Sequence, residues 1–213
     1  MTRLRIALAK GRLYDQSVER FRLAGAEIAS DPGRRLLIPS SDPTIEFIVV
    51  KPGDVPVYVE SGAADLGITG TDVLRESGAD VLEPLELGFG ACRLVVATPR
   101  ETAYPHLPGG NTARVATKYP RLAWRHFATA GRPVDIIQIG GSVEVAPLLG
   151  LSHWIVDLVD TGNTLRANDL VERETILSCG AILVANRASQ KLKLDAYLDL
   201  MSRLEAAESP SNR

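Results

Sequence analysis

Residues 160–164, with the sequence DTGNT, combine the residue types that a phosphate-binding turn uses. The mostly apolar residues around Asp157, from 155 to 159, predict a buried strand before the turn, and residues 165–170 have the apolar spacing of a helix after it. Such a strand–turn–helix directs free backbone N–H groups and the positive end of the helix dipole at one point. Gly162 would let the backbone approach a ligand, and the two threonines would add hydroxyl donors. The turn therefore predicts a phosphate site, although a helix cap explains such a turn about as often.

Two carboxylates accompany this turn, Asp157 near the end of the predicted strand and Asp160 at the mouth of the turn. Neither can bind phosphate directly, because like charges repel. Carboxylates at such a place are explained if the ligand also carries sugar hydroxyls or a metal ion. Phosphate, ribose and Mg²⁺ together indicate a phosphoribosyl group.

Three further glycine-bearing turns follow predicted strands: Lys10-Gly11-Arg12, residues 70–72 (GTD) and residues 140–142 (GGS). Lys51 also stands directly after a predicted strand. Open α/β sheets bind their ligands at the carboxyl ends of the strands. A solvated turn is the alternative for Lys10 and Arg12, because exposed charges are common. Four such turns around one cleft would suit ligands that carry several phosphates.

Several segments resemble one known family. The run DLVDTGNTLRANDL is similar to the loop of ATP phosphoribosyltransferases that binds 5-phosphoribosyl 1-diphosphate (PRPP). AKGRL, KPGDVPVYVESGAADLGITGTDVL and ELGFGACRLVVA resemble the same family, and the resemblance runs from Ile6 to about Leu204 in the family's order. Many members carry arginine where this chain has Lys51, which keeps the charge but lacks the bidentate fork of a guanidinium.

The resemblance implies the first reaction of histidine biosynthesis, in which the 5-phosphoribosyl group of PRPP moves to N1 of ATP and pyrophosphate leaves. It assigns Lys10, Arg12 and Lys51 to the phosphate charges, and Mg²⁺ to the diphosphate. Asp157 would accept hydrogen bonds from the ribose 2′- and 3′-hydroxyls. The remaining substrate-binding residues would be Gly11, Asp160, Thr161, Gly162, Asn163, Thr164 and Leu165, with Thr161 to Thr164 on the 5′-phosphate. Asp72 and Glu144, each near the start of a predicted helix, would either contact nucleotide or cap the helix.

The histidines do not point to side-chain nucleophilic or acid–base catalysis. His106, His126 and His153 lie in separate segments, and we expect His126 on a helix surface. No Ser-His-Asp or Cys-His set shares a motif. Catalysis should instead come from positioning two anionic substrates and stabilising the departing pyrophosphate.

The alternation of short predicted strands and helices indicates an α/β fold with mainly parallel sheets. Glycines near residue 90 and a return of the chain near residue 180 suggest two lobes, residues 1–90 with 181–213 and residues 91–180. The resemblance implies a fold similar to two-lobed type II periplasmic binding proteins, with the active site in the cleft between the lobes. We further expect a turn at 31–33, strands over 35–39 and 114–117, one closing helix from Arg187 to about Ala207, and a disordered tail.

Composition limits the remaining possibilities. The chain has 213 residues, of which 45% are hydrophobic and 23% charged, with a net charge of −2. This balance argues against general nucleic-acid binding. Cys92 and Cys179 lie in apolar surroundings without metal-ligand spacing, so we expect reduced thiols in a cytoplasmic protein and no metal site made by the protein alone. No apolar run has the length of a signal peptide or a membrane span.

The C-terminal residues bear on the partner. A polar tail of about ten residues after the last predicted helix is too short for a further domain. The chain therefore resembles the short form of the family. By resemblance, its partner is a regulatory subunit similar to histidyl-tRNA synthetase, in a hetero-octamer, and the chain alone is a homodimer that does not respond to histidine.

Two other functions stay open on the residues alone. A two-lobed cleft with anion-binding turns would also serve a non-catalytic protein, such as a cytosolic sensor of a small anionic solute. The PRPP loop by itself would equally fit a phosphoribosyltransferase that uses a different base. The motifs outside that loop favour the ATP-dependent family over both.

Overall fold

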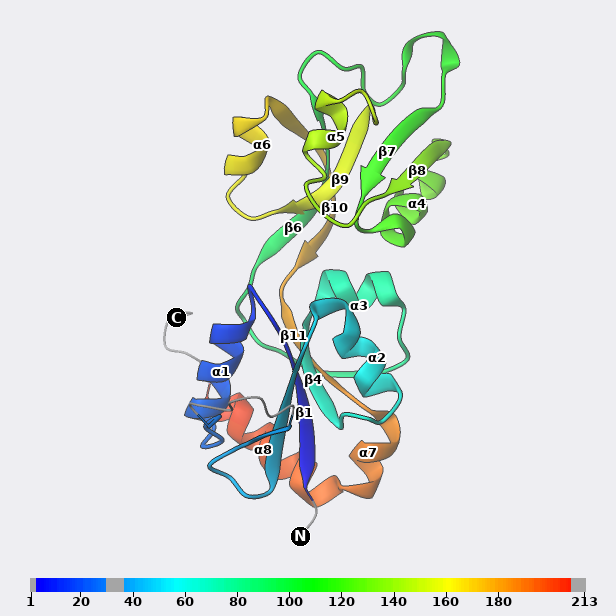
Figure 1. The fold of residues 1–213 in the computed structure, drawn as a ribbon. Coiled ribbons are helices and arrows are strands. Elements are labelled where there is room, and N and C mark those ends of the chain that lie inside the picture. Colours follow the sequence, from blue (N-terminus) through cyan, green and yellow to red (C-terminus); the bar gives the residue numbers. More distant parts are fainter. Residues whose placement is uncertain (1–2, 30–36, 208–213) are drawn as a thin grey trace. The chain divides into compact units, whose positions relative to one another are not determined.

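The computed structural model describes residues 3–29 and 37–207 (Figure 1). The chain folds into two compact units, unit 1 with Met1–Gly90 and Gly180–Arg213, and unit 2 with Ala91–Cys179. We propose that these units are the two lobes expected from the sequence. The expected turn at 31–33, the first residues of a strand expected over 35–39, and the expected disordered tail lie outside the described residues.

Unit 1 is built on a mixed sheet. Its described residues form six strands in the order β2-β3-β1-β4-β11-β5. Their bounds are β1 Leu4–Ala9, β2 Leu37–Pro39, β3 Ile45–Val50, β4 Leu66–Gly70, β5 Leu82–Glu86 and β11 Ala181–Ala185. β1 runs parallel to both β3 and β4, whereas β2, β5 and β11 run antiparallel to their neighbours. The parallel trio brings three carboxyl ends to one edge.

Helices cover both faces of this sheet (Figure 1). They are α1 Tyr14–Leu23, α2 Val55–Glu60, α3 Thr71–Ser77, α7 Arg187–Leu192 and α8 Leu194–Ala206, with a 3₁₀ turn, η1, at Pro52–Asp54. Side chains alternate across a strand, so Leu8 of β1 packs with the residues of α1 and α8, and Ala7 with those of α2 and α3. Both clusters are buried, which makes unit 1 a three-layer structure with two apolar interfaces.

Unit 2, all of whose residues are described, contains a second mixed sheet in the order β10-β6-β9-β7-β8. The strands are β6 Cys92–Pro99, β7 Ala113–Thr117, β8 Val134–Gln138, β9 Trp154–Val159 and β10 Leu170–Cys179. The helices are α4 Pro120–Thr129, α5 Val145–Leu148 and α6 Asn163–Ala167, and η2 spans Pro108–Gly110. α4 packs on one face of the sheet, and α5 and α6 pack on the other.

The expectation of mainly parallel sheets is wrong. Of the nine strand pairings in the described part of the chain, four are parallel and five antiparallel. Four of these five antiparallel pairings involve β6, β10 or β11, the strands next to the points where the chain passes between units, and the fifth joins β2 to β3. β6 leaves unit 1 and β10 returns to it, and these two long strands pair with each other. Their register places Cys92 opposite Cys179, and both are free, buried thiols.

Two expected helices also differ from the structure. The closing helix is broken at Lys193, whose ammonium donates to the carbonyl of Arg3 and the carboxylate of Asp65 at 2.8 Å each. The helix after the DTGNT turn ends at Ala167. Leu170 instead begins β10 and pairs with Pro99, because the ladder with β6 competes with helix propagation.

An ion-pair cluster joins α4 to β10. The carboxylate of Glu174 accepts from the guanidinium of Arg132 at 2.7 and 2.9 Å and lies 2.7 Å from His126 Nε2. Arg132 also donates to the hydroxyl of Tyr104 at 2.7 Å, and the Tyr104 ring stacks edge-on against Trp154. His126 is therefore not a helix-surface residue as expected, because its side chain is only 20% exposed.

Among the described residues, no helix combines the length and apolarity needed to cross a membrane.

Candidate functional site

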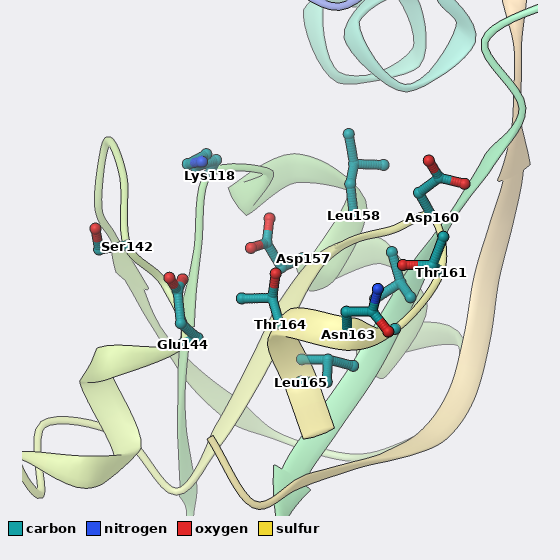
Figure 2. A pocket seen from close by; sticks show the side chains of 12 residues that line it. Lys118, Ser142, Glu144, Asp157, Leu158, Asp160, Thr161, Asn163, Thr164 and Leu165 are labelled. Atoms are coloured by element: carbon teal, nitrogen blue, oxygen red, sulfur yellow. The ribbon is translucent and has the colours of Figure 1, made fainter. Parts of the chain in front are cut away.

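A cavity of about 350 Å³ opens at one edge of the sheet of unit 2 (Figure 2). A cavity of this volume lies within the range of small-molecule sites. It is lined by Lys118, Ser142, Glu144, Asp157, Leu158, Val159, Asp160, Thr161, Gly162, Asn163, Thr164 and Leu165. Polar and charged side chains predominate, so the cavity suits a polar ligand.

Parallel strand order brings these residues together. β7 lies between β8 and β9 and is parallel to both, so the carboxyl ends of the three strands meet at one edge. Lys118 follows β7 directly, and Glu144 follows the turn after β8. Asp157 lies two residues before the end of β9, ahead of the DTGNT turn. This edge is where open α/β sheets place their ligands.

The DTGNT turn has the backbone geometry of a close-approach loop. Gly162 has φ +76°, a left-handed conformation that favours glycine, and an added Cβ would lie 3.2 Å from a guanidinium nitrogen of Arg166. α6 begins at the next residue, so the amides of its first turn have no partner within the helix. The side chain of Asn163 accepts a hydrogen bond from Arg166 and caps no backbone N–H. A side-chain cap, the alternative to ligand binding, is therefore not what this turn contains.

Asp157 is half-buried beside the turn, and its surroundings oppose its charge. Burial raises the pKa of this carboxyl, and the nearby carboxylate of Glu144 raises it further. The backbone N–H of Leu158 and the ammonium of Lys118 act in the other direction. Asp157 is half-buried and has no ion pair among the described residues. Its carboxylate is therefore suited to accept hydrogen bonds from the hydroxyl groups of a ligand.

The expected residues of unit 2 all line this cavity. Asp157, Asp160 and residues 161–164 face it, and Leu165 lies beneath the turn, where it is 5% exposed within an apolar cluster. Glu144 occupies the N-cap position of α5 but makes no capping hydrogen bond with its side chain. The two alternatives for Glu144 were a nucleotide contact and a helix cap, and its side chain does not form the cap.

The expected residues of unit 1 gather at a different edge. Lys10, Gly11 and Arg12 follow β1, Lys51 follows β3, and Asp72 follows β4, which are the parallel neighbours of the first sheet. Lys10 and Lys51 are exposed, and the guanidinium of Arg12 donates to the carbonyl of Gly90 at 2.8 Å. Asp72 is 3% exposed in the first turn of α3. Each unit thus carries its own set of polar residues at strand ends.

Lys118, Ser142, Leu158 and Val159 line the cavity but were not named as site residues from the sequence, although the GGS turn that contains Ser142 was expected near a ligand. A usable signal existed for Lys118, because it directly follows the strand expected over 114–117, as Lys10 and Lys51 follow theirs. Ser142 belongs to the GGS turn, and its φ of +48° is unusual for a residue with a side chain. Leu158 and Val159 were expected as strand residues only.

The donor set of the cavity suits Mg²⁺ only together with a ligand. No group of three or more His, Cys, Asp or Glu that could hold a metal occurs among the described residues. The cavity does present the carboxylates of Glu144, Asp157 and Asp160. Mg²⁺ commonly uses one or two carboxylates together with substrate phosphates and water. The residues therefore fit an ion that arrives with a phosphorylated ligand.

Comparisons with known proteins identify the chain. The family model "HisG: ATP phosphoribosyltransferase" matches residues 51–206. The ATP phosphoribosyltransferase of Sorangium cellulosum is 49% identical over 212 residues, covering 99% of this chain and 98% of that protein. The ATP phosphoribosyl transferase of a Thermotoga maritima HisG:HisZ complex superposes with a TM-score of 0.85 at 32% identity, covering 96% of this chain and 98% of that one.

The fold is also that of proteins with other functions. The periplasmic aliphatic sulphonate-binding protein SsuA from Escherichia coli matches with a TM-score of 0.59 at 12% identity, covering 98% of this chain and 73% of that one. The expected likeness to type II periplasmic binding proteins is thereby confirmed. The relatives of similar length, the solved structure and the family model agree: this chain belongs to the ATP phosphoribosyltransferase (HisG) family.

Proposed function

We propose that the chain transfers the 5-phosphoribosyl group of PRPP to N1 of ATP, giving N1-(5-phosphoribosyl)-ATP and pyrophosphate in the first step of histidine biosynthesis. The observation that carries the proposal is the joint presence of the DTGNT turn and Asp157 in one cavity of unit 2, in a member of this family. The turn suits a phosphate and the carboxylate suits sugar hydroxyls. Together they match the two ends of a ribose 5-phosphate group.

The turn would hold the 5′-phosphate. Backbone N–H groups of residues 162–165 and the hydroxyls of Thr161 and Thr164 are suitable donors, and no carboxylate other than Asp160 belongs to the turn. Asp157 would accept hydrogen bonds from the 2′- and 3′-hydroxyls. With both contacts made, the ribose ring is fixed and its C1′ has a defined direction. Positioning of this kind lowers a barrier by removing the freedom of the reactants before the reaction.

The chemical step needs no side-chain nucleophile. N1 of the adenine attacks C1′, the bond from C1′ to the diphosphate oxygen breaks, and its electron pair leaves with pyrophosphate. Negative charge therefore grows on the leaving group. Lys10, Arg12 and Lys51 are the residues of unit 1 that we assign to this charge, since positive groups aimed at developing charge give large rate effects. Mg²⁺ bound to the diphosphate would supply further charge neutralisation.

A regulatory partner follows from the same family. The T. maritima relative was solved in a HisG:HisZ complex. We assign a HisZ-type subunit to this chain as well, with the hetero-octamer and the free homodimer as the expected assemblies. We place the reaction in the cytoplasm, as expected from the sequence.

The test is direct. Purified chain is mixed with ATP, PRPP and Mg²⁺, and product formation is followed by its absorbance. The expected signal requires both substrates and disappears when either is omitted. Ligand binding without turnover, also after addition of a HisZ-type subunit, would support the anion-binding alternative. Turnover with another base in place of ATP would support a different phosphoribosyltransferase.

A further inference from the structure

Lys118 stands out among the residues that line the cavity of unit 2. Of the twelve described residues that do so, it alone is basic, while Glu144, Asp157 and Asp160 are acidic. Its side chain is exposed and forms no hydrogen bond or ion pair with any residue in the ranges 3–29 and 37–207. The ammonium is therefore available to a ligand.

Several other cations of unit 2 are committed to the protein itself. Arg93 pairs with Glu172 at 3.0 Å, and Arg132 pairs with Glu174 at 2.7 Å. Arg173 donates to the hydroxyl of Thr98 at 2.9 Å. Lys118 differs from these arginines because its ammonium has no hydrogen-bond or ion-pair partner among the described residues, although its charge lowers the pKa of Asp157. An ammonium with three rotatable donors can adapt to a ligand oxygen that a rigid pair could not reach.

The cavity has a definite order of groups. In the view of Figure 2, Asp157 and Thr164 lie between two sets of residues, with Asp160, Thr161 and Asn163 on one side and Lys118, Ser142 and Glu144 on the other. A ribose whose 5′-phosphate is on the turn and whose 2′- and 3′-hydroxyls are at Asp157 spans the first side. C1′ is bonded to C2′, so the substituent on C1′ continues past Asp157. In PRPP that substituent is the diphosphate.

We propose that Lys118 contacts the diphosphate at C1′ of PRPP and stabilises it as it departs. The inference rests on the proposed function and extends it to a residue of unit 2. Three carboxylates line the same cavity, so a cation is needed there if a group with several negative charges is to enter. When the bond from C1′ to oxygen breaks, the electron pair goes to pyrophosphate, and the ammonium lies where that charge appears.

The substrate can be divided into two probes that test this contact separately. Mg-pyrophosphate represents the leaving group, and ribose 5-phosphate represents the part held by the turn and Asp157. Each is titrated calorimetrically into the whole purified wild-type chain, Lys118→Met, Lys118→Arg and Lys191→Met. Lys191 lies on α7 of unit 1, is exposed and does not line the cavity, so it controls for the loss of one positive charge.

We expect Lys118→Met to weaken Mg-pyrophosphate binding about tenfold or more, the scale of one hydrogen bond to a charged group. Its affinity for ribose 5-phosphate should change far less, because Lys118 reaches that part of the site only by offsetting in part the burial that raises the pKa of Asp157. Asp157→Asn should give the opposite pattern, with weaker ribose 5-phosphate binding and unchanged Mg-pyrophosphate binding. Lys118→Arg should recover most of the affinity, and Lys191→Met should match wild type. In turnover, Lys118→Met should lower kcat because the charge on the leaving group grows in the transition state.

Three results would overturn the inference: no Mg-pyrophosphate binding by wild type, equal Mg-pyrophosphate binding by wild type and Lys118→Met, or equal loss of both probes in Lys118→Met. The last would mean that the cavity itself is damaged. Failure of the proposed function has a different signature, because wild type would then form no product from ATP and PRPP, even with a HisZ-type subunit present, whatever Lys118→Met does to Mg-pyrophosphate binding.

Discussion

The cluster around Glu174 makes a quantitative prediction about the stability of unit 2. The guanidinium of Arg132, together with hydrogen bonds from Tyr104 and His126, lowers the pKa of the Glu174 carboxyl from 4.5 to about 2, against the smaller effect of burial. Replacing this residue in Glu174→Gln keeps the shape and one acceptor oxygen but removes the charge. Arg132, whose side chain is only 11% exposed, would then lack its ionic partner.

The loss of stability in Glu174→Gln can be worked out from the difference between the ordinary and the folded pKa of Glu174 and from the exposure of its side chain. At about 1.36 kcal/mol for each unit of pKa, the change from 4.5 to about 2 gives a ceiling of roughly 3.4 kcal/mol. The Glu174 side chain is 31% exposed, so solvent screening reduces this ceiling. We therefore expect Glu174→Gln to lower the free energy of unfolding of unit 2 by about 1–2 kcal/mol at pH 7.

The sign of the pH dependence is fixed by linkage. A carboxyl whose pKa is lowered in the folded state contributes its full stability above its unfolded pKa, near 4.5, and loses that contribution as pH falls toward about 2. The difference between wild type and Glu174→Gln should hence be constant from pH 7 to about 5 and shrink at lower pH. Urea unfolding followed by tryptophan fluorescence measures it, because both tryptophans, Trp124 and Trp154, belong to unit 2.

Glu101→Gln is the matched control. Glu101 is an exposed residue of the same unit, and its replacement changes the net charge equally. It should alter the free energy of unfolding by less than about 0.5 kcal/mol, as is usual for surface positions. A difference between wild type and Glu174→Gln that is the same at pH 7 and pH 3.5 would refute the reasoning, since the loss would then not come from the charge on Glu174.

Three further predictions concern the proposed site. Asp157→Asn should weaken PRPP binding by roughly 1.5–3 kcal/mol, the value of one charge-assisted hydrogen bond, without lowering the thermal midpoint, because burial opposes this charge. Titration calorimetry and thermal unfolding check both parts, and wild-type affinity in the variant would exclude the ribose contact. Lys51→Ala should raise the kinetic barrier by roughly 2–4 kcal/mol with little change in thermal midpoint, and Lys51→Arg should keep much of the activity. Steady-state kinetics measure this change. Near-wild-type rates for Lys51→Ala would show that Lys51 is a solvated surface charge and does not stabilise the leaving group. The chain alone should be insensitive to histidine, and a HisZ-type partner should confer inhibition, because feedback requires a second coupled site. A histidine titration in the activity assay decides this, and strong inhibition without partner would contradict it.

What could be predicted from the sequence is local. The DTGNT turn and Asp157 are contiguous, so a strand, a glycine and a helix start are enough to place them within one site. Lys10, Arg12 and Lys51 each follow a short apolar run, and strand ends can be recognised from such runs without knowing which strands pair. The family resemblance extended these local predictions to a function and a fold.

What only the tertiary structure decided is which distant segments meet. The sequence does not encode strand order in any short pattern, so the mixed sheets and the pairing of β6 with β10 could not be predicted. The same pairing ends the helix after Ala167 and brings Cys92 to Cys179. Lys118 and Glu144 reach Asp157 because β7 pairs with β9 and β8 pairs with β7. The pKa of Asp157 depends on that assembled environment. Burial and charge proximity are properties of three-dimensional packing, and residues separated by dozens of positions acquire them only when the chain is folded.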